Sequence, residues 1–325
     1  DGVMLSDCQS GEIDLSRYSL DNVEQLSLVV GDNDDIFIPA RNASASAVLN
    51  IQTIGMPTED TDPHLTAQLK VGSFGYASPF LRYMQNLSDK FAFSALGEYT
   101  YAENDYPYEI QNGSKVVKDR RTNSRMNTGH GELNFVWRAN SHNSLSGKVY
   151  YYDNDRQLPG QVHYYTNVNK ETLHDQNFFS QLQYLSQYGD SWSLKCLAKY
   201  NWNASVYQDP LMPNRVNDAS YWQREAYASA AVLYALSEQW AFDYSADYSY
   251  NNLNSSASRT IDSRPYRHTI LQSATAKYRN NRLTALARLL YSLYLNDAKD
   301  GASAQNMRRL SPSISLSYKL LEVIA

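Results

Sequence analysis

The sequence is short of cysteine, of long apolar runs and of any strong excess of charge. Its two cysteines, Cys8 and Cys196, lie far apart and in unlike surroundings, so a disulfide framework is not indicated. No stretch approaches about 18 consecutive apolar residues, which excludes a transmembrane helix. The formal net charge of −5 argues against the basic surface that nucleic-acid binding requires.

Motifs of catalysis and of metal binding are also missing. The chain has no P-loop, no G-x-G-x-x-G and no G-x-S-x-G element, and its histidines lack the spacing of metal ligands. An EF-hand starting at Asp32 would need glycine at 37 and glutamate at 43, where the chain has Phe37 and Ala43. We therefore expect no enzyme, no cofactor and no resident metal. An irregular calcium site or a solvated turn is left open around Asp32–Asp35.

Tyrosine, by contrast, is abundant at 27 residues, and the stretch Trp240–Tyr250 shows how it is used. Alternate residues of this stretch are apolar or aromatic: Trp240, Phe242, Tyr244, Ala246, Tyr248 and Tyr250. The residues between them are mostly polar: Ala241, Asp243, Ser245, Asp247 and Ser249. This alternation predicts a strand with one apolar and one wet face.

Aromatic residues also recur ten positions apart on one face of several predicted strands. The pairs are Trp240 and Tyr250, Trp192 and Trp202, and Phe91 and Tyr101. At about 3.3 Å per residue and a tilt of about 40°, ten residues project to roughly 25 Å, the height of the apolar band on outer-membrane barrels. The repetition predicts a transmembrane antiparallel β-barrel. The mean hydropathy of −0.56 is compatible with this fold, because only alternate residues meet lipid.

About twelve strands follow one another from His64 onward, joined by connections that alternate in length. We predict strands near residues 64–72, 76–87, 90–103, 128–139, 143–153, 176–188, 191–206, 222–236, 239–252, 266–279, 282–296 and 308–320. Long polar segments fall near 104–127, 154–175, 207–221, 253–265 and 297–307, with tight turns between the other strands. The alternation predicts an up-and-down meander with periplasmic tight turns and extracellular long loops.

Residues 1–54 differ from the rest, because they carry few aromatic residues and only short apolar runs. We expect a short helical turn at Ser19–Glu24 and a buried strand at Gln25–Val30. The segment is predicted to be a small mixed α/β unit with too little apolar surface for a core of its own. Residues 55–63 are a polar linker that contains proline, and residues 64–325 are the predicted barrel.

Several short motifs resemble those of the TonB-dependent outer-membrane receptors. Ser10–Tyr18 and Val48–Thr53 are similar to the later half and the end of the plug domain of that family. The first motif is similar to the vitamin B12 receptor branch in particular. Gly72–Gly75, Asp105–Tyr108 and Arg156–Gly160 are similar to early barrel segments.

The resemblance implies that residues 1–54 are the C-terminal part of an α/β plug inside a barrel of about 22 strands. About twelve strands are roughly half of such a barrel, so we interpret the chain as a fragment of a longer exported precursor. The family imports scarce bulky nutrients, so the expected ligand is cobalamin or an iron chelate such as a ferric siderophore. The expected partners are the lipid bilayer of the outer membrane and a periplasmic TonB-type protein, which would bind an N-terminal box missing from these residues.

Candidate ligand contacts come from the plug and from the long loops. The resemblance places Leu5–Glu12 in an apical loop of the plug, from which we select Ser6, Asp7, Gln9 and Ser10. Tyrosine offers a broad apolar face with a polar tip, although girdle positions are the alternative explanation for it. On the long-loop side we select Tyr106, Tyr108, Tyr164 and Tyr165, flanked by Tyr150–Tyr152 and Tyr207. Arg120, Arg121 and Arg125 form either a basic cluster for an anionic chelate or lipid phosphate, or a solvated loop.

Two other functions remain open for the sequence. One is an adhesin-like surface barrel whose loops bind host or matrix, and the other is a porin-like barrel without active transport. Residues 1–54 separate the receptor from both, because neither alternative needs a folded unit ahead of its first strand.

Overall fold

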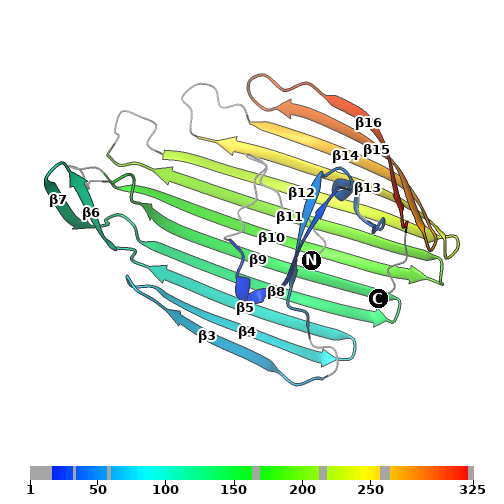
Figure 1. Ribbon diagram of the computed structural model, residues 1–325, viewed down its shortest axis with the longest axis horizontal. Coiled ribbons are helices and arrows are strands. Elements are labelled where there is room, and N and C mark those ends of the chain that lie inside the picture. The colour runs from blue at the N-terminus through cyan, green and yellow to red at the C-terminus, as the bar shows by residue number, and fades with distance from the viewer. Residues whose placement is uncertain are drawn as a thin grey trace.

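Antiparallel strands make up nearly all of the computed structural model, which describes residues 17–31, 34–56, 60–162, 169–211, 218–256 and 264–320. One sheet contains twelve strands in the order β3, β4, β5 and then β8 to β16, so each strand pairs with the next along the chain (Figure 1). Two further hairpins, β1 with β2 and β6 with β7, stand apart from it. The predicted up-and-down meander is confirmed.

The strands of the large sheet run from His64 to Tyr318. Their bounds are β3 (His64–Val71), β4 (Ala77–Ser88), β5 (Phe91–Ala102), β8 (Met126–Asn140), β9 (Asn143–Leu158), β10 (Glu171–Tyr188), β11 (Trp192–Gln208), β12 (Asp218–Ala235), β13 (Trp240–Ser255), β14 (Pro265–Arg279), β15 (Leu283–Ala298) and β16 (Met307–Tyr318). The turns β4–β5, β8–β9, β10–β11, β12–β13 and β14–β15 are tight and share one rim, and the longer connections share the other. We call these the short-turn rim and the long-loop rim.

The two faces of the sheet differ as the alternation predicts. Along β13, the side chains of Trp240 and Tyr248 are 41% and 43% exposed on the outer face. On the inner face, Asp243 and Asp247 are each only 4% exposed. Cys196 of β11 is a free thiol that shares its face with Trp192 and Tyr200. The apolar face therefore points outward, and the polar face is the buried one.

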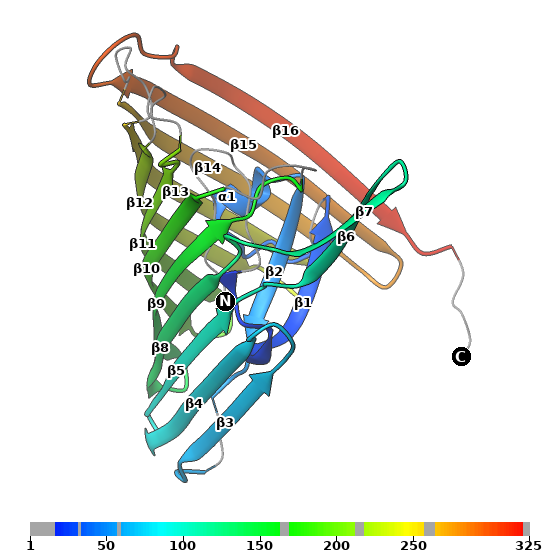
Figure 2. The same cartoon turned by 90° about the vertical axis from the view of Figure 1, so that its left-hand side faces the viewer.

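The sheet curves around a small unit formed by residues 17–56 on its concave, inner side (Figure 2). This unit contains the 3-10 turn η2 (Leu20–Asn22), β1 (Val23–Val30), the short helix α1 (Ala40–Ala43) and β2 (Ala47–Thr53). The predicted helical turn and strand are therefore present. No helix among the described residues is long and apolar enough to cross a membrane.

The prediction that the strand at Gln25–Val30 is buried is wrong for the described part of the chain. Leu28 is 64% exposed and Val30 is 71% exposed. The reason is that β1 pairs only with β2, so this two-stranded sheet keeps one side open. A short apolar run indicates a strand but does not show which of its faces finds a partner.

The structure also corrects the predicted loops. The polar segment 104–127 contains a hairpin, β6 (Pro107–Asn112) and β7 (Lys115–Arg120), which projects beyond the long-loop rim (Figures 1 and 2). Strands β9 and β10 extend further into the predicted loop 154–175, to Leu158 and from Glu171. Above the apolar band both faces of a strand meet water or polar groups, so strand pairing continues there without alternating hydrophobicity.

Candidate functional site

The inner face of the sheet binds the unit 17–56 through two polar clusters. The Glu225 cluster consists of Arg41, Lys199, Glu225, Tyr227, Ser229 and Asp247. The Glu132 cluster consists of Asn22, Glu98, His130, Glu132 and Lys148. In both, strand alternation presents the side chains inward, where residues 17–56 meet them.

In the Glu225 cluster, a fully buried carboxylate joins α1 to the sheet. Arg41 of α1 donates from Nη1 to Oε1 of Glu225 at 2.6 Å, and Lys199 of β11 donates to Oε2 at 3.4 Å. Glu225 has no exposed surface, and the Arg41 guanidinium also lies 5.3 Å from the centroid of the Tyr227 ring. A buried carboxylate is costly unless cations stay beside it, so Glu225 favours the docked position of α1.

Asp247 of β13 binds the start of the same helix. Its Oδ2 accepts a hydrogen bond from the Arg41 backbone amide at 2.8 Å, and its Oδ1 accepts one from the Ala40 amide at 3.2 Å. Tyr227 and Ser229 of β12 donate their hydroxyls to the same carboxylate at 2.8 and 2.7 Å. The first amides of a helix have no partner within the helix, so Asp247 satisfies groups that would otherwise be buried unpaired.

In the Glu132 cluster, one carboxylate of β8 meets a residue of its own strand, a residue of the neighbouring β9 and the unit 17–56. Glu132 accepts hydrogen bonds from the Asn22 amide at 3.2 Å and lies 3.0 Å from Nε2 of His130. Lys148 of β9 pairs with Glu132 at 3.3 Å and contacts Thr53 at 3.4 Å. Asn22 immediately precedes Val23, which pairs with Thr53, so this cluster contacts the open end of the β1–β2 pair.

A buried aromatic group extends the Glu132 cluster. Tyr150 of β9 has no exposed surface and stacks on Phe179 of β10 with ring centroids 4.7 Å apart. Tyr18 also packs against Tyr150, with ring centroids 5.5 Å apart, and the Tyr150 hydroxyl donates to the Arg17 carbonyl at 2.5 Å. Tyr150, taken from sequence as a tyrosine flanking the ligand side, is therefore a contact of the inner unit.

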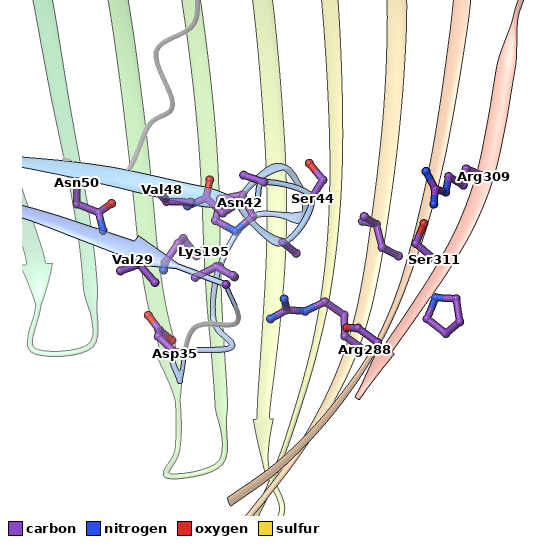
Figure 3. A pocket seen from close by; sticks show the side chains of 18 of the residues that line it. Val29, Asp35, Asn42, Ser44, Val48, Asn50, Lys195, Arg288, Arg309 and Ser311 are labelled. Carbon is purple, nitrogen blue, oxygen red and sulfur yellow. The ribbon is translucent and has the colours of Figure 1, made fainter. Parts of the chain in front are cut away.

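A cavity of about 560 Å³ lies between the unit 17–56 and strands β10, β11, β15 and β16 (Figure 3). Lys195, Arg288 and Arg309 line its strand side, and Asp35 lies on the inner unit. Lys195 donates to the Phe37 carbonyl at 2.6 Å, and Arg288 donates from Nε to the Thr275 hydroxyl at 3.3 Å. The charged residues that line the cavity are three cations and one acid, so their net charge is positive.

Of the predicted ligand contacts, the structure places Tyr106 and Tyr108 at the β6–β7 hairpin. Tyr106 is 44% exposed and packs edge-on against Phe74 of the β3–β4 connection, with centroids 6.2 Å apart. Tyr108 is half-buried, and this burial together with the nearby Asp119 carboxylate raises its pKa. Its hydroxyl therefore stays protonated as a hydrogen-bond donor. Both rings are at the long-loop rim, as predicted.

The other predicted contacts lie outside the described residues. These are Ser6, Asp7, Gln9, Ser10, Tyr164 and Tyr165. Of the segment Asp32–Asp35, only Asp34 and Asp35 are described, and the calcium hypothesis is not tested. Among the described residues, no group of three or more His, Cys, Asp or Glu side chains is arranged to hold a metal ion.

The arginine cluster predicted in the 104–127 loop is divided among different contacts. Arg120 pairs with Asp105 at 2.7 Å on the hairpin. Arg121 is buried and donates to the Gly160 carbonyl at 2.7 Å. Arg125 is exposed at the start of β8. The three side chains therefore do not form one anion site.

Sequence reasoning missed the residues that carry the two clusters. Glu225, Lys199 and Glu132 are charged side chains at inward positions of strands that are otherwise regular. A charge at mid-strand, well inside the predicted apolar band, was the available signal. Its partner on residues 17–56 depends on tertiary folding and has no local pattern.

Comparisons with solved structures identify the fold. The FrpB iron transporter from Neisseria meningitidis matches with a TM-score of 0.74 and 11% sequence identity, over 93% of this chain and 52% of its own. The copper transporter OprC matches with a TM-score of 0.69 and 11% identity, over 93% and 48%. The chain has the fold of a TonB-dependent receptor barrel.

A third structure agrees. The ferric-catecholate import receptor Fiu from E. coli K12 has a TM-score of 0.67 and 8% identity, over 92% of this chain and 53% of its own. The chain thus spans about half the length of the receptors that share its fold. No protein-family model and no curated protein sequence match it.

Proposed function

We propose that this chain is part of an outer-membrane receptor that binds a bulky metal chelate at its long-loop rim and imports it actively. Residues 1–54 are then the C-terminal part of the plug, 55–63 a linker and 64–325 the N-terminal part of the barrel. A periplasmic TonB-type protein supplies the energy. The receptor makes and breaks no bond in its ligand.

The outer face supports the membrane placement. Trp192 stacks on Tyr234 with centroids 4.4 Å apart, and Trp240 packs on Tyr278 at 4.9 Å, all next to the short-turn rim. Aromatic rings in a band at the end of an apolar sheet face are typical of a bilayer interface. The curved sheet with its apolar side outward suits the wall of a lipid-embedded barrel.

The observation that carries the proposal is the seating of residues 17–56 on the inner face. The two clusters bury the carboxylates of Glu225 and Glu132 on the sheet and pair them with Arg41 and Asn22 of the inner unit. A buried carboxylate is costly unless such partners stay beside it. A porin needs an open lumen, and an adhesin needs no polar contact between its interior and a separate unit. A docked plug that must later be moved fits active import.

The ligand class follows from charge. The cavity beside the plug is lined by Lys195, Arg288 and Arg309, which favours an anionic solute on the path past the plug. Two of the proteins that share the fold are named for iron and for ferric-catecholate transport, and a third for copper. An anionic ferric or cupric chelate is our first candidate, and cobalamin is the second.

Binding and uptake by the full-length receptor test this function. Ferric citrate, a ferric catecholate and cobalamin are titrated into the purified receptor, and one should bind with a Kd of about 1 μM or tighter. Cells should accumulate that same compound only when the TonB-type protein is present. If none of the three binds, the nutrient-receptor proposal fails. If uptake persists without the TonB-type protein, the chain is a passive pore.

The hairpin tyrosines test where the ligand binds. Replacing Tyr106 and Tyr108 by Ala removes two aromatic faces at the long-loop rim and should weaken binding about tenfold. Tyr188→Ala is the matched control, because Tyr188 is 58% exposed at the short-turn rim. An equal effect of Tyr188→Ala would place the contact elsewhere.

A further inference from the structure

The outer face of the sheet carries a groove whose floor is made of glycine. Gly97 of β5 and Gly131 of β8 are directly paired, and Gly129 lies two residues further along β8. An added Cβ would meet nothing within 4 Å at Gly97 or Gly129, and only the Leu96 carbonyl at 3.8 Å at Gly131. The groove has a volume of about 870 Å³.

The walls of the groove follow from the strand register. Across the sheet, Leu81 pairs with Gly97, Gly97 with Gly131, and Gly131 with Tyr151. Leu81 and Tyr151 are 52% and 43% exposed on this outer face. Leu81 and Tyr151 are the two walls, and they stand three strand spacings of about 4.8 Å apart, which is roughly 14 Å. The two glycines between them have no side chains, so they put nothing into the space between the walls. The gap is wide enough for a hydrocarbon chain and closed at its base by backbone.

A nearby glycine shows that the chain fills such a gap itself elsewhere. Gly147 of β9 lies opposite Phe135 of β8 on the same face, and an added Cβ there would lie 2.2 Å from Cε1 of Phe135. The Phe135 ring therefore covers the bare backbone at Gly147. No ring of the described residues covers Gly97, Gly129 or Gly131, which leaves that floor for an external group.

The height of the groove matches one leaflet of the bilayer. Phe91 pairs with Trp137 at the short-turn rim, and Gly97 is six residues further along β5, roughly 15 Å higher at the usual rise and tilt. Tyr101 marks the opposite end of the apolar band, roughly 10 Å above Gly97. The groove thus lies in the half of the band nearest the long loops.

The upper end of the groove is polar and cationic. Tyr99 donates its hydroxyl to Asn127 at 3.1 Å, and Tyr151 donates to Asp153 at 3.2 Å. Arg125 precedes Asn127 by two residues, so it lies closer to the long-loop rim, and it is exposed. Its backbone amide donates to Oε1 of Gln157 on β9 at 3.2 Å.

Two carboxylates around the upper end have partners, and a third, Asp155, lies opposite Asn127 and is exposed. Asp153 is bound by His174 at 3.1 Å and by Gln176 at 2.8 Å, and Glu103 accepts the Tyr101 hydroxyl. Arg125 supplies a positive charge just above the tyrosines, at the height of lipid headgroups.

We propose that this groove binds one phosphorylated lipid of the outer leaflet, with an acyl chain on the Gly97–Gly131 floor and its phosphate at Arg125. This proposal rests on the membrane placement of the proposed function but not on the identity of the imported ligand. From the membrane centre toward the long-loop rim, the site presents the glycine floor, then the amphipathic tyrosines and then a cation. This is the order in which a lipid presents its acyl chain, its interfacial region and its phosphate.

Native mass spectrometry of the full-length receptor, released from detergent micelles, tests the site. Dipalmitoyl phosphatidic acid is the probe, and dipalmitoyl phosphatidylcholine is the lipid with a neutral net charge. We expect the first phosphatidic acid molecule to bind more tightly than any further phosphatidic acid molecules bound to the same receptor. Gly131→Phe, which fills the floor, should weaken both lipids about tenfold through lost chain contact. Ala198→Phe, a small-to-large change on the outer face of β11, should weaken neither.

Arg125→Gln tests the headgroup separately. It should lower the affinity for phosphatidic acid about tenfold, to that of phosphatidylcholine, because a charge-assisted hydrogen bond is lost. Arg120→Gln on the hairpin should leave both affinities unchanged. Heat-dependent electrophoretic mobility confirms that each variant is folded.

Three results would overturn the lipid site. Equal effects of Gly131→Phe and Ala198→Phe would mean annular lipid only. A dimer that Gly131→Phe dissociates would make the groove a contact between copies of the receptor. Retained preference for phosphatidic acid in Arg125→Gln would place the phosphate elsewhere. None of these readouts needs the imported ligand, so they stand apart from a failure of the transport proposal.

Discussion

At the scale of single residues, the docked unit depends on a carboxylate that is out of contact with water. Glu225 is fully buried between Arg41 and Lys199, and Arg41 is the only one of the three that belongs to the inner unit. Removing one partner of a buried pair leaves an uncompensated charge, which costs more than the pair itself contributes. The Arg41–Glu225 contact is therefore the point at which docking is most sensitive to substitution.

We predict that Arg41→Met lowers the free energy of undocking residues 17–56 by about 3 kcal/mol, and that adding Glu225→Gln restores part of the loss. The urea concentration at which a protease cleaves within residues 34–56 of the full-length receptor measures both changes. Arg264→Met is the control, because its pair with Asp300 is half-exposed and should be worth less than about 1 kcal/mol. Equal losses from Arg41→Met and Arg264→Met would contradict a buried cluster.

Sequence alone could predict which residues face inward, but not what they meet. The alternation in Trp240–Tyr250 correctly assigned Asp243 and Asp247 to the wet face. Asp247 binds the backbone amides of Ala40 and Arg41, which precede it in the chain by 207 and 206 positions. No local sequence pattern encodes a contact over such a separation. Strand period is a property of the backbone, whereas pairing across the interior is set by the tertiary fold.

At the scale of elements, the two polar clusters hold the inner unit at two separate places, beside single contacts such as that of Lys195 with the Phe37 carbonyl. The Glu225 cluster binds α1, and the Glu132 cluster binds the open end of the β1–β2 pair through Asn22 and Thr53. Between them β1 is largely exposed, and the described part of the chain adds little apolar packing. Elements with few buried apolar contacts open locally at low free energy, so the two places are free to loosen independently.

Hydrogen exchange on the full-length receptor distinguishes the two contacts. Glu225→Gln should raise amide exchange at residues 38–44 about tenfold and leave residues 17–23 unchanged, because only the α1 contact is weakened. Glu132→Gln should do the reverse, with faster exchange at 17–23 and 51–54. Exchange that rises throughout 17–56 in both variants would show a single cooperative unit instead.

Elements also show where a pattern stops being informative. The sequence predicts a polar loop where the structure has the β6–β7 hairpin, in which Ile110 pairs with Val117. The hairpin stands in water on both sides, so neither face needs to be apolar, and its strands carry no alternation of the required length. Strands inside the apolar band were predicted within a few residues, because there the lipid and the polar interior impose a period of two.

At the scale of the whole molecule, the sorting of connections gives the sheet a direction. The tight turns that join β4 to β5, β8 to β9, β10 to β11, β12 to β13 and β14 to β15 lie on one rim. The hairpin, the long connections and the five-residue β3–β4 connection lie on the other. The groove, the hairpin tyrosines and Arg125 all belong to the long-loop rim, whereas Trp192 and Trp240 belong to the short-turn rim. The proposed ligand binding and the proposed lipid site thus both require the long-loop rim to face outward.

Cysteine labelling on intact cells tests that direction with two matched serines. In a full-length receptor with Cys8 and Cys196 replaced by Ala, Ser114→Cys lies in the tight turn of the β6–β7 hairpin and Ser141→Cys in the β8–β9 turn. A membrane-impermeant maleimide should label position 114 on intact cells and position 141 only after the outer membrane is permeabilised, because outer-membrane barrels place tight turns in the periplasm. Labelling of position 141 alone on intact cells would show that the orientation is the opposite one, and the lipid site would then not lie in the outer leaflet. Labelling of both without permeabilisation would show that the sheet does not span the membrane.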